Sequence, residues 1–374
     1  MSIGKGAFGQ SAKGSFIESA MGARGWEAIG ADIFAATFST TGSNLYGISF
    51  AGDRRWRYSI SNIRALGPGA NNVYGKMGMD DECVYLPMIR QAAWAGSGGA
   101  SASVLAIYKS SGLVKWHYDT GANANFTCAI GDGTVIVGSG AFVYKLSSTG
   151  VLVWSFNIAS GMTDGVVNSV GDIIIVNAGA PATLTKISGA GVFIANNAAA
   201  YPASANQYSA IDTDETDVLY VTYADAGADN RDIVCIGSAM ASELWIANSG
   251  GGRNNACAPR AINKVGQYVM VTNIISGLRQ VYGGTVGSAI DVGNQAERQF
   301  GIDLSTEPGL FAYVGGRRTT SWLGSGGATA NLVKADVSVS AFPPSSTVWG
   351  LDLKDSSTQE EVVLVAAKKH WNAI

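Results

Sequence analysis

The chain has 374 residues, of which 47% are hydrophobic and 14% charged, and this balance excludes a disordered chain and predicts an ordered globular protein with a large core. A formal net charge of −3, with Lys and Arg scattered along the chain, excludes the basic field that drives phosphate binding, so we expect no nucleic-acid partner. The apolar runs, such as DIIIV from 172, are far shorter than the ~20 residues that cross a bilayer, so we expect no membrane insertion.

The first residues, MSIGKGAFGQSAKGSF, contain Lys5 but no apolar stretch after it, so no signal peptide is expected. We predict that residues 1–25 form an N-terminal segment and that residues 26–374 form one domain, because no linker or change in composition interrupts the rest of the chain.

Eight stretches share one order: an apolar pair, a polar turn and a β-branched or aromatic run. An example is FTCAIGDGTVIVGSGAFVYKL from 126. Their second strands are expected to begin about 38 to 52 residues apart, which is the spacing of one four-stranded sheet per unit. The expected starts are Asp32, Cys83, Thr134, Asp172, Asp217, Gln267, Gly309 and Glu361.

A second phrase follows in most units: a strand, a turn and a closing strand, as in LAIYKSSGLVKWHY from 105 and VYKLSSTGVLVWSF from 143. Gly112, Gly150 and Gly191 share one turn position, where glycine supplies a positive φ without a Cβ clash. The closing strand carries a tryptophan with a large apolar face that can cover the gap between neighbouring sheets. These residues are Trp56, Trp116, Trp154 and Trp245.

The repeat predicts an all-β fold, a β-propeller of four-stranded antiparallel blades over residues 26–374. Eight blades are favoured, because there are eight inner phrases, and seven blades are the alternative, because there are only seven complete later halves. We expect the N-terminal segment either to close the ring, with KGSFIESA from 13 as the missing outer strand, or to act as a docking arm on a neighbouring subunit.

The unit GDGTVIVGSG…VYKLSSTGVLVWSF resembles the blade of the pyrroloquinoline-quinone-type (quinoprotein-like) propeller repeat, over residues 104–197 and 208–250. Gly150 and Trp154 match the family's last two landmarks, whereas the units from 277 and 318 show no tryptophan landmark. Enzymatic members of this family hold a quinone and Ca²⁺ with the help of adjacent cysteines. Here Cys83, Cys128, Cys235 and Cys257 are far apart, so the resemblance implies the blade and no cofactor.

No catalytic set is expected. His117 and His370 have no Ser or Cys in a nucleophile-elbow context, and the Gly-rich runs lack the Lys-Ser/Thr ending of a phosphate loop. The stretch DTDETD is a weak candidate for a cation site, through Asp212, Asp214 and Asp217, but it lacks the Gly and the distal Glu of an EF-hand; a solvated hairpin turn is the alternative.

These absences favour a non-enzymatic structural and interaction platform. The richness in Gly, Ala, Ser and Thr resembles bacteriophage virion proteins, so we expect a tail, collar or capsid-attached component, made in the host cytoplasm and present in several copies in the virion. Its partners would be other virion or assembly proteins, or a glycan or receptor on the host surface. The alternatives are a divergent propeller enzyme or a soluble carbohydrate-binding propeller that stacks sugars on aromatic residues. The candidates for such stacking are Trp94, Tyr201, Trp322 and Trp371.

Overall fold

The computed structural model describes most of the strands and their turns. The described residues are 15–17, 31–39, 42–60, 76–91, 97–130, 133–177, 183–197, 207–214, 216–224, 233–247, 262–265, 268–273, 277–282, 285–290, 299–305, 311–319, 328–336, 347–353 and 361–367. Every regular element among them is a β-strand, so the all-β prediction is confirmed. None of these residues belongs to a helix that is long and apolar enough to span a bilayer.

Five sheets of four antiparallel strands follow one another along the chain. The first consists of β5 (Gly78–Met79), β6 (Cys83–Gln91), β7 (Ala102–Tyr108) and β8 (Val114–Tyr118). The second consists of β9 (Ala124–Ile130), β10 (Thr134–Ser139), β11 (Phe142–Leu146) and β12 (Leu152–Asn157). The third consists of β13 (Met162–Val167), β14 (Ile173–Asn177), β15 (Thr183–Ile187) and β16 (Phe193–Asn197). The fourth consists of β17 (Gln207–Thr213), β18 (Leu219–Ala224), β19 (Ile233–Ile236) and β20 (Glu243–Ala247). The fifth consists of β21 (Ile262–Val265), β22 (Tyr268–Asn273), β23 (Gly277–Tyr282) and β24 (Thr285–Ile290).

A sixth sheet has nine strands and joins the two ends of the chain. One half contains β1 (Ser15–Ile17), β2 (Ile33–Ser39), β3 (Gly42–Ile48), β4 (Arg54–Ile60) and β29 (Glu361–Ala367). The other half contains β25 (Gln299–Ser305), β26 (Phe311–Thr319), β27 (Ala330–Asp336) and β28 (Thr347–Leu351). A single bridge, between Arg317 of β26 and Glu361 of β29, connects the two halves.

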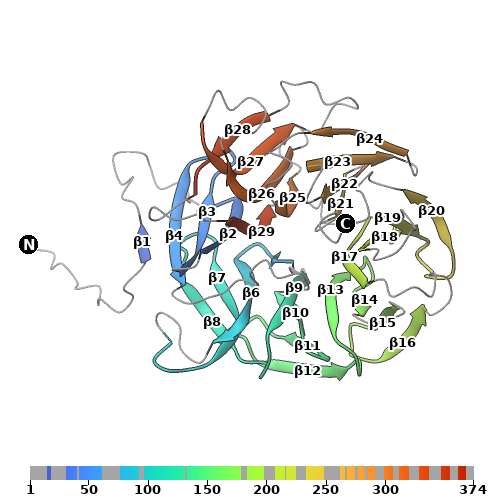
Figure 1. Ribbon diagram of the computed structural model, residues 1–374. Helices are drawn as coiled ribbons and strands as arrows, with labels where there is room; N and C mark the ends of the chain where they lie inside the picture. Colours follow the sequence, from blue (N-terminus) through green and yellow to red (C-terminus); the bar gives the residue numbers. More distant parts are fainter. Residues whose placement is uncertain are drawn as a thin grey trace, which may run out of the picture.

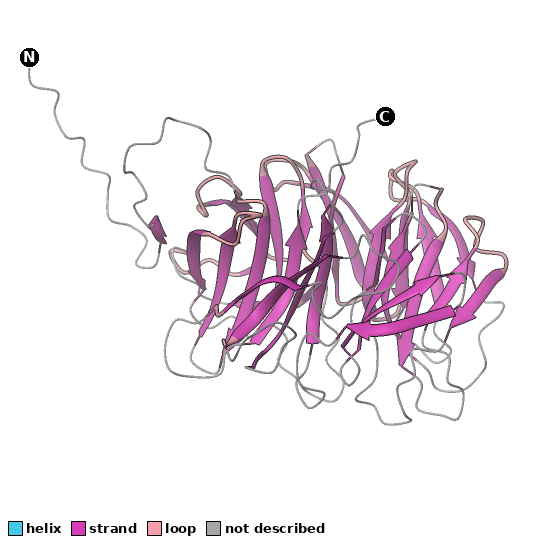
Figure 2. Ribbon diagram, turned by 90° about the horizontal axis from the view of Figure 1, so that it is seen from above, coloured by secondary structure: helices cyan, strands magenta, loops and turns pink. Residues whose placement is uncertain are grey.

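The sheets stand around a common centre as a propeller (Figure 1). In the four-stranded sheets the first strand, such as β9, β13 and β17, lies near the centre, and the fourth strand lies at the outer rim. Seen from above in Figure 2, the strands run between the two faces of the ring. The propeller of four-stranded antiparallel sheets expected from the repeat is therefore present.

The expected number of blades is corrected, because the pairing of the described strands defines six sheets and neither eight nor seven separate ones. The phrase that ends in Glu361–Ala367 does not begin an eighth unit. Instead, β29 pairs with β2 and becomes the innermost strand of the first unit. The bridge from Arg317 then merges this unit with β25–β28.

The ring does not close in the expected way, with the N-terminal segment as the outer strand of the last blade. β28 is the fourth strand beside β27, so no outer strand is missing there. β1, which lies within KGSFIESA, pairs antiparallel with β4 instead, as a fifth strand on the outside of the first unit. The pairing of β2 with β29 is what joins the two ends of the chain within one sheet.

The hydrophobic core lies between neighbouring sheets. β-branched sequences such as IIIVN in β14 form strands that are buried on both faces, as a sheet covered by a neighbour on each side requires. One cluster joins Phe34 and Leu45 of the first unit to Val84 and Leu105 of the next sheet. Another joins Ile33 and Tyr46 to Tyr313 and Leu332, so the core continues across the meeting point of the two ends. The clusters that follow the chain between them are built in the same way.

A repeated contact between tryptophan and glycine holds the sheets together at their outer strands. Trp56 of β4 donates its indole N–H to the carbonyl of Lys109 at 2.8 Å, and a Cβ on Gly112 would lie 2.6 Å from its ring. Trp116 of β8 does the same to Ser148 at 3.0 Å and packs on Gly150. The tryptophan of each sheet therefore docks on the third-to-fourth-strand turn of the next.

The docking continues from Trp154 of β12, which donates to the carbonyl of Gly189 at 3.1 Å and packs on Gly191. Gly150 and Gly191 have φ values of 79° and 80°, which a side chain rarely adopts, and the approaching indole leaves no room for a Cβ. Both demands explain why glycine stands at this turn position.

Trp349 also docks on a neighbouring unit, although the sequence pattern did not predict this contact. Trp349 of β28 donates to the carbonyl of Phe50 at 3.2 Å and lies over Gly52, in the turn between β3 and β4. The unit from 318 therefore does have its tryptophan landmark, contrary to the expectation, and this landmark connects the last unit to the first.

Candidate functional site

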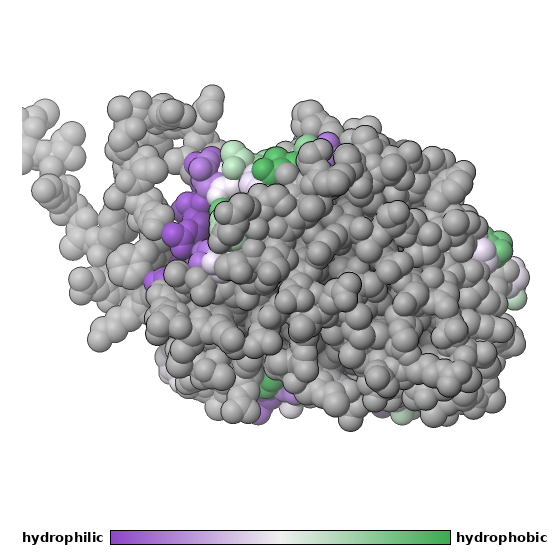
Figure 3. Space-filling model, turned by 45° about the horizontal axis from the view of Figure 1, so that its top comes forward, coloured by the Kyte–Doolittle hydropathy of each residue, from purple (hydrophilic) through white to green (hydrophobic). Residues whose placement is uncertain are grey.

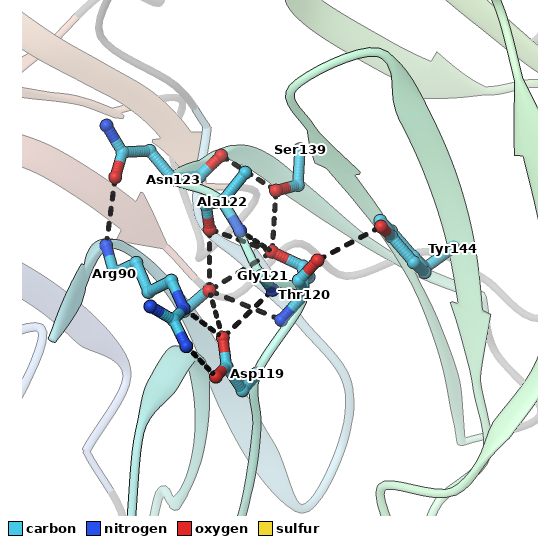
Figure 4. Close-up of polar contacts among 9 residues, drawn as sticks. Arg90, Asp119, Thr120, Gly121, Ala122, Asn123, Ser139 and Tyr144 are labelled. Atoms are coloured by element: carbon cyan, nitrogen blue, oxygen red, sulfur yellow. Dashed lines mark hydrogen bonds and ion pairs between the residues drawn. The ribbon is translucent and has the colours of Figure 1, made fainter. Parts of the chain in front are cut away.

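A polar network, shown in Figure 4, lies where the chain crosses from β8 to β9. Arg90, at the end of β6, donates from Nε and Nη2 to the two carboxylate oxygens of Asp119, both at 2.8 Å. This bidentate hydrogen bond is the main reason why the pKa of Asp119 lies below its usual value and that of Arg90 above it. The pair anchors the crossing loop on the neighbouring strand.

The remaining polar atoms of this network pair with one another. The hydroxyls of Thr120 and Ser139 lie 2.6 Å apart, Ser103 donates to the carbonyl of Ala122 at 2.6 Å, and Tyr144 donates to the carbonyl of Thr120 at 3.2 Å (Figure 4). Ser103 also donates to Oδ1 of Asp119 at 3.4 Å, so the carboxylate that pairs with Arg90 holds this hydroxyl as well. The network therefore has the form of a loop anchor between two sheets.

A second polar cluster lies on inner strands, near the centre of the ring. Lys76, just before β5, donates from Nζ to the carbonyl of Ile211 in β17 at 2.8 Å, and its Nζ lies 3.8 Å from Asp212. The buried carboxylate of Asp164 in β13 accepts from the backbone N–H of Ile211 at 3.0 Å and of Gly165 at 2.8 Å. Lys76 thus ties residues 135 positions apart in sequence, from two different sheets.

The pKa of Asp164 is raised to about 6, mainly because burial removes the hydration of the charged form and, to a smaller extent, because Asp212 lies nearby. The ammonium of Lys76 and the two backbone donors act in the opposite direction. Asp164 is therefore a group whose charge changes near neutral pH, although the sequence analysis did not single it out.

The carboxylates of Asp212, Asp214 and Asp217, the weak candidates for a cation site, each contact a different part of the structure. Asp212 lies beside Lys76 near the centre of the ring. Asp214 accepts hydrogen bonds from Thr216 and Val218 of its own hairpin and from the hydroxyl of Tyr220. Asp217 accepts from the backbone and hydroxyl of Ser169, in the turn of the neighbouring sheet. These carboxylates hold the hairpin and its neighbours, and do not converge on one point.

The described residues contain no group of three or more His, Cys, Asp or Glu side chains that could hold a metal ion. Cys83, Cys128 and Cys235 are buried thiols outside any disulfide, and burial raises the pKa of Cys83 to about 12. Cys257 and His370 lie outside the described residues, while His117 is exposed on β8. The sugar-stacking candidates Trp94, Tyr201, Trp322 and Trp371 also lie outside the described residues.

The outer rim shows an unusual concentration of exposed apolar side chains. They follow the docking glycine directly: Leu113 after Gly112, then residues 151–153 after Gly150, and residues 192–194 after Gly191. Val153 is 55% exposed and Phe193 is 50% exposed. We call this surface the apolar rim. Its residues are Leu113, Val151, Leu152, Val153, Val192, Phe193, Ile194 and Leu244.

The rim segments of two adjacent sheets lie close together. Trp154 of β12 docks on Gly189 and Gly191, immediately before Val192, so the rim segments of β12 and β16 are neighbours. In Figure 1 the strands β8, β12, β16 and β20 follow one another around the edge of the ring. A monomer gains nothing from such a surface, and contiguous exposed apolar side chains mark interaction sites.

The corresponding positions of the first unit are polar. Gly52 is followed by Asp53, Arg54 and Arg55, and the strand they begin carries β1 on its outside. Figure 3 shows hydrophilic side chains gathered on the side of the ring that carries β1 and β4. The candidate functional site is therefore the apolar rim along β8, β12, β16 and β20, and Val348, at the equivalent position of β28, is also exposed. Sequence analysis missed it because the same residues also read as ordinary strand residues.

Comparison with known proteins adds a likeness of fold. Among the solved structures that are similar to this chain, two match at 10% sequence identity each. BamB from Moraxella catarrhalis matches with a TM-score of 0.48 over 76% of this chain and 96% of its own. A protein of unknown function from Bacteroides caccae matches with a TM-score of 0.47 over 90% of this chain and 98% of its own. No sequence profile of a known protein family matches the chain, and no curated protein does. The assignment of the propeller therefore stands on the strand pairing described above.

Proposed function

We propose that this protein is a non-catalytic docking platform that binds neighbouring proteins through the apolar rim. The observation that carries the proposal is the run of exposed apolar residues on β12 and β16, above all Leu152, Val153, Phe193 and Ile194. Removing apolar surface from water contributes about 25 cal/mol per Å², so a partner that covers this belt gains affinity without any charge or metal.

The two polar clusters support a non-catalytic function, because their charged groups are engaged with other parts of the scaffold. Arg90 and Asp119 are engaged with each other, and Lys76 is engaged with Ile211 and Asp212. Groups that hold the scaffold in this way favour a structural role for the polar interior. The Gly-x-x-x-Trp spacing at Gly52, Gly112 and Gly150 supports a repeat of the pyrroloquinoline-quinone type, used here as a scaffold without a quinone.

The proposed setting is a virion, with the protein as a tail, collar or capsid-attached component in several copies. The composition, rich in Gly, Ala, Ser and Thr, supports this setting. An assembly would also explain the apolar rim, because a neighbouring subunit held in a fixed place can keep these apolar side chains buried. The partners would be virion or assembly proteins, with a glycan or receptor of the host surface as the second class.

The test uses variants of the rim in assembled particles. Leu152→Lys combined with Phe193→Lys places two charges in the belt, and we expect the protein to fold normally but to be lost from purified particles. Val170→Lys is the matched control, because Val170 is 73% exposed in the β13–β14 turn, outside the belt. Particles that retain the rim variant as well as the control would contradict docking through the rim. Absence of the wild-type chain from particles would contradict the virion setting.

A further inference from the structure

An outer strand of this ring already accepts an added strand. β1 pairs antiparallel with β4, with Ser15 opposite Tyr58, Phe16 opposite Arg57 and Ile17 opposite Trp56. The added strand lies next to the segment Trp56-Arg57-Tyr58, which begins four residues after the turn glycine Gly52.

The same edge recurs twice in the ring. Four residues after Gly112 stand Trp116-His117-Tyr118 on β8, and four residues after Gly150 stand Trp154-Ser155-Phe156 on β12. Each segment has the pattern of tryptophan, any residue, aromatic. In the described residues β8 and β12 are the last strands of their sheets, so their outward backbone groups have no neighbouring strand. Such an edge is a ready template for strand addition.

Of these edges, β12 matches the chemistry of β1 best. On β4 the apolar Phe16 lies opposite Arg57, on a strand that begins with Arg54 and Arg55. On β12 the equivalent of Arg57 is Ser155, a small exposed residue, and the preceding Leu152 and Val153 are exposed and apolar. In this register the diagonal neighbour of Phe16 on the same face is the apolar Val153 on β12 but the charged Arg55 on β4, and apolar neighbours on one face stabilise strand pairing.

The chain between β1 and β2 is long enough to leave its own ring. Residues 18–32 separate Ile17 from Ile33, and fifteen residues span up to about 50 Å when extended. The strand β1 can therefore reach an edge of an adjacent molecule.

We infer that the N-terminal strand of one molecule adds to the open edge of β12 in a second copy of this chain, in the register that β1 has on β4. Phe16 then lies opposite Ser155, and Phe16 and Ile17 extend the apolar rim of the second copy. The contact joins two different surfaces, so it is head-to-tail and builds rings or chains of molecules. This inference rests on the proposed docking function of the rim and names the strand that docks there.

Disulfide trapping between two separately prepared variants tests the inference. Phe16→Cys and Ser155→Cys are mixed under mild oxidation, and directly opposite strand residues lie close enough for a disulfide. The matched control replaces Ser155→Cys by Ser148→Cys, an exposed position in the adjacent turn. The double variant Phe16→Cys/Arg57→Cys reports the pairing within one molecule.

We expect a covalent heterodimer from Phe16→Cys with Ser155→Cys, at least about tenfold more abundant than from the Ser148→Cys mixture, and lost when Ile17 is also changed to Asp. Equal yields from the two mixtures would overturn the inference. So would trapping confined to the Phe16→Cys/Arg57→Cys molecule. Loss of the Leu152→Lys/Phe193→Lys variant from particles, alongside a failed trapping experiment, would leave the docking function in place and remove the second copy as its occupant.

Discussion

The outer strands β4 and β12 occupy equivalent places in their sheets, and they differ in what they present to solvent. In both, a tryptophan docks on the turn of the next sheet: Trp56 on Gly112 and Trp154 on Gly191. In β4 the exposed positions are Asp53 and Arg54 and an added strand lies outside, whereas in β12 they are Val151, Leu152 and Val153 and the edge is open.

The comparison distinguishes the inward-facing positions of the outer strands, which stabilise the ring, from the outward-facing positions, which are available to other molecules. The inward-facing positions are constrained by the neighbouring sheet, because a Cβ at the docking glycine would overlap an indole. The outward positions carry no such constraint, so an apolar residue there needs another explanation. A partner that covers it is the explanation we propose.

The largest expected effect is on the docking tryptophans, where the two strands should behave alike. Trp56→Ala and Trp116→Ala, which empty buried sites, should lower the free energy of unfolding by roughly 3 to 5 kcal/mol. Trp154→Ala, whose side chain is partly exposed, should lie at the lower end of that range. Denaturant unfolding measures these values. Losses below about 1 kcal/mol at all three sites would contradict the docking contacts.

The second prediction concerns pH and the inner strands, where Asp164 has a pKa raised to about 6. The folded state binds this proton more tightly than the unfolded state, so the resulting stability is fully present below pH 4 and is lost as the pH rises through 6. The expected loss is about 3 kcal/mol. Asp164→Asn should remove this dependence, and Lys76→Met should move it to higher pH, because Lys76 lowers this pKa. An identical pH profile for Asp164→Asn and the unmodified protein would contradict the assignment.

The third prediction separates backbone strain from docking. Gly150 and Gly171 have φ values of 79° and 84°, but only Gly150 faces an indole, and a Cβ on Gly171 would meet nothing within 4 Å. Gly171→Ala should cost about 1 kcal/mol through the backbone alone. Gly150→Ala should cost about 2 kcal/mol more, because Trp116 must move. Equal costs would show that the tryptophan does not depend on this contact.

Much of the scaffold can be predicted from the sequence, because its signals are local. The second strands of the units were expected near Asp32, Cys83, Thr134 and Asp172, and strands begin at Ile33, Cys83, Thr134 and Ile173. The Gly-x-x-x-Trp spacing likewise marks a turn and its closing strand, which adjoin in sequence. Alternating apolar residues and a turn glycine are enough to place them.

The closure and the rim could not be predicted in this way. Trp349 docks near Gly52, about 300 residues earlier, and β29 pairs with β2 at the other end of the chain. No local pattern marks such a partner, so the sequence alone predicts that β29 begins another unit. Val153 and Phe193 have the sequence of buried strand residues, and only their exposure in the ring marks them as a surface.

The smallest expected effect on stability is at the rim itself. Leu152→Lys and Phe193→Lys should change the free energy of unfolding by less than about 0.5 kcal/mol, because both residues lie on the surface with about half of their area already exposed. A loss comparable to that of Trp154→Ala would show that the rim supports the fold and is not a free docking surface.

Hydrogen–deuterium exchange, measured on the full chain at low and high protein concentration, tests most directly whether the edge of β12 is a docking surface. We expect the backbone amides of residues 151–157 to become protected as the concentration rises, because an added strand takes up the outward N–H groups of β12. Residues 54–60 of β4 should lose protection over the same range of concentration, because β1 leaves its own β4 when it adds to β12 of a second copy. Exchange in residues 151–157 that does not change with concentration, or protection that develops on β4 instead, would contradict the account.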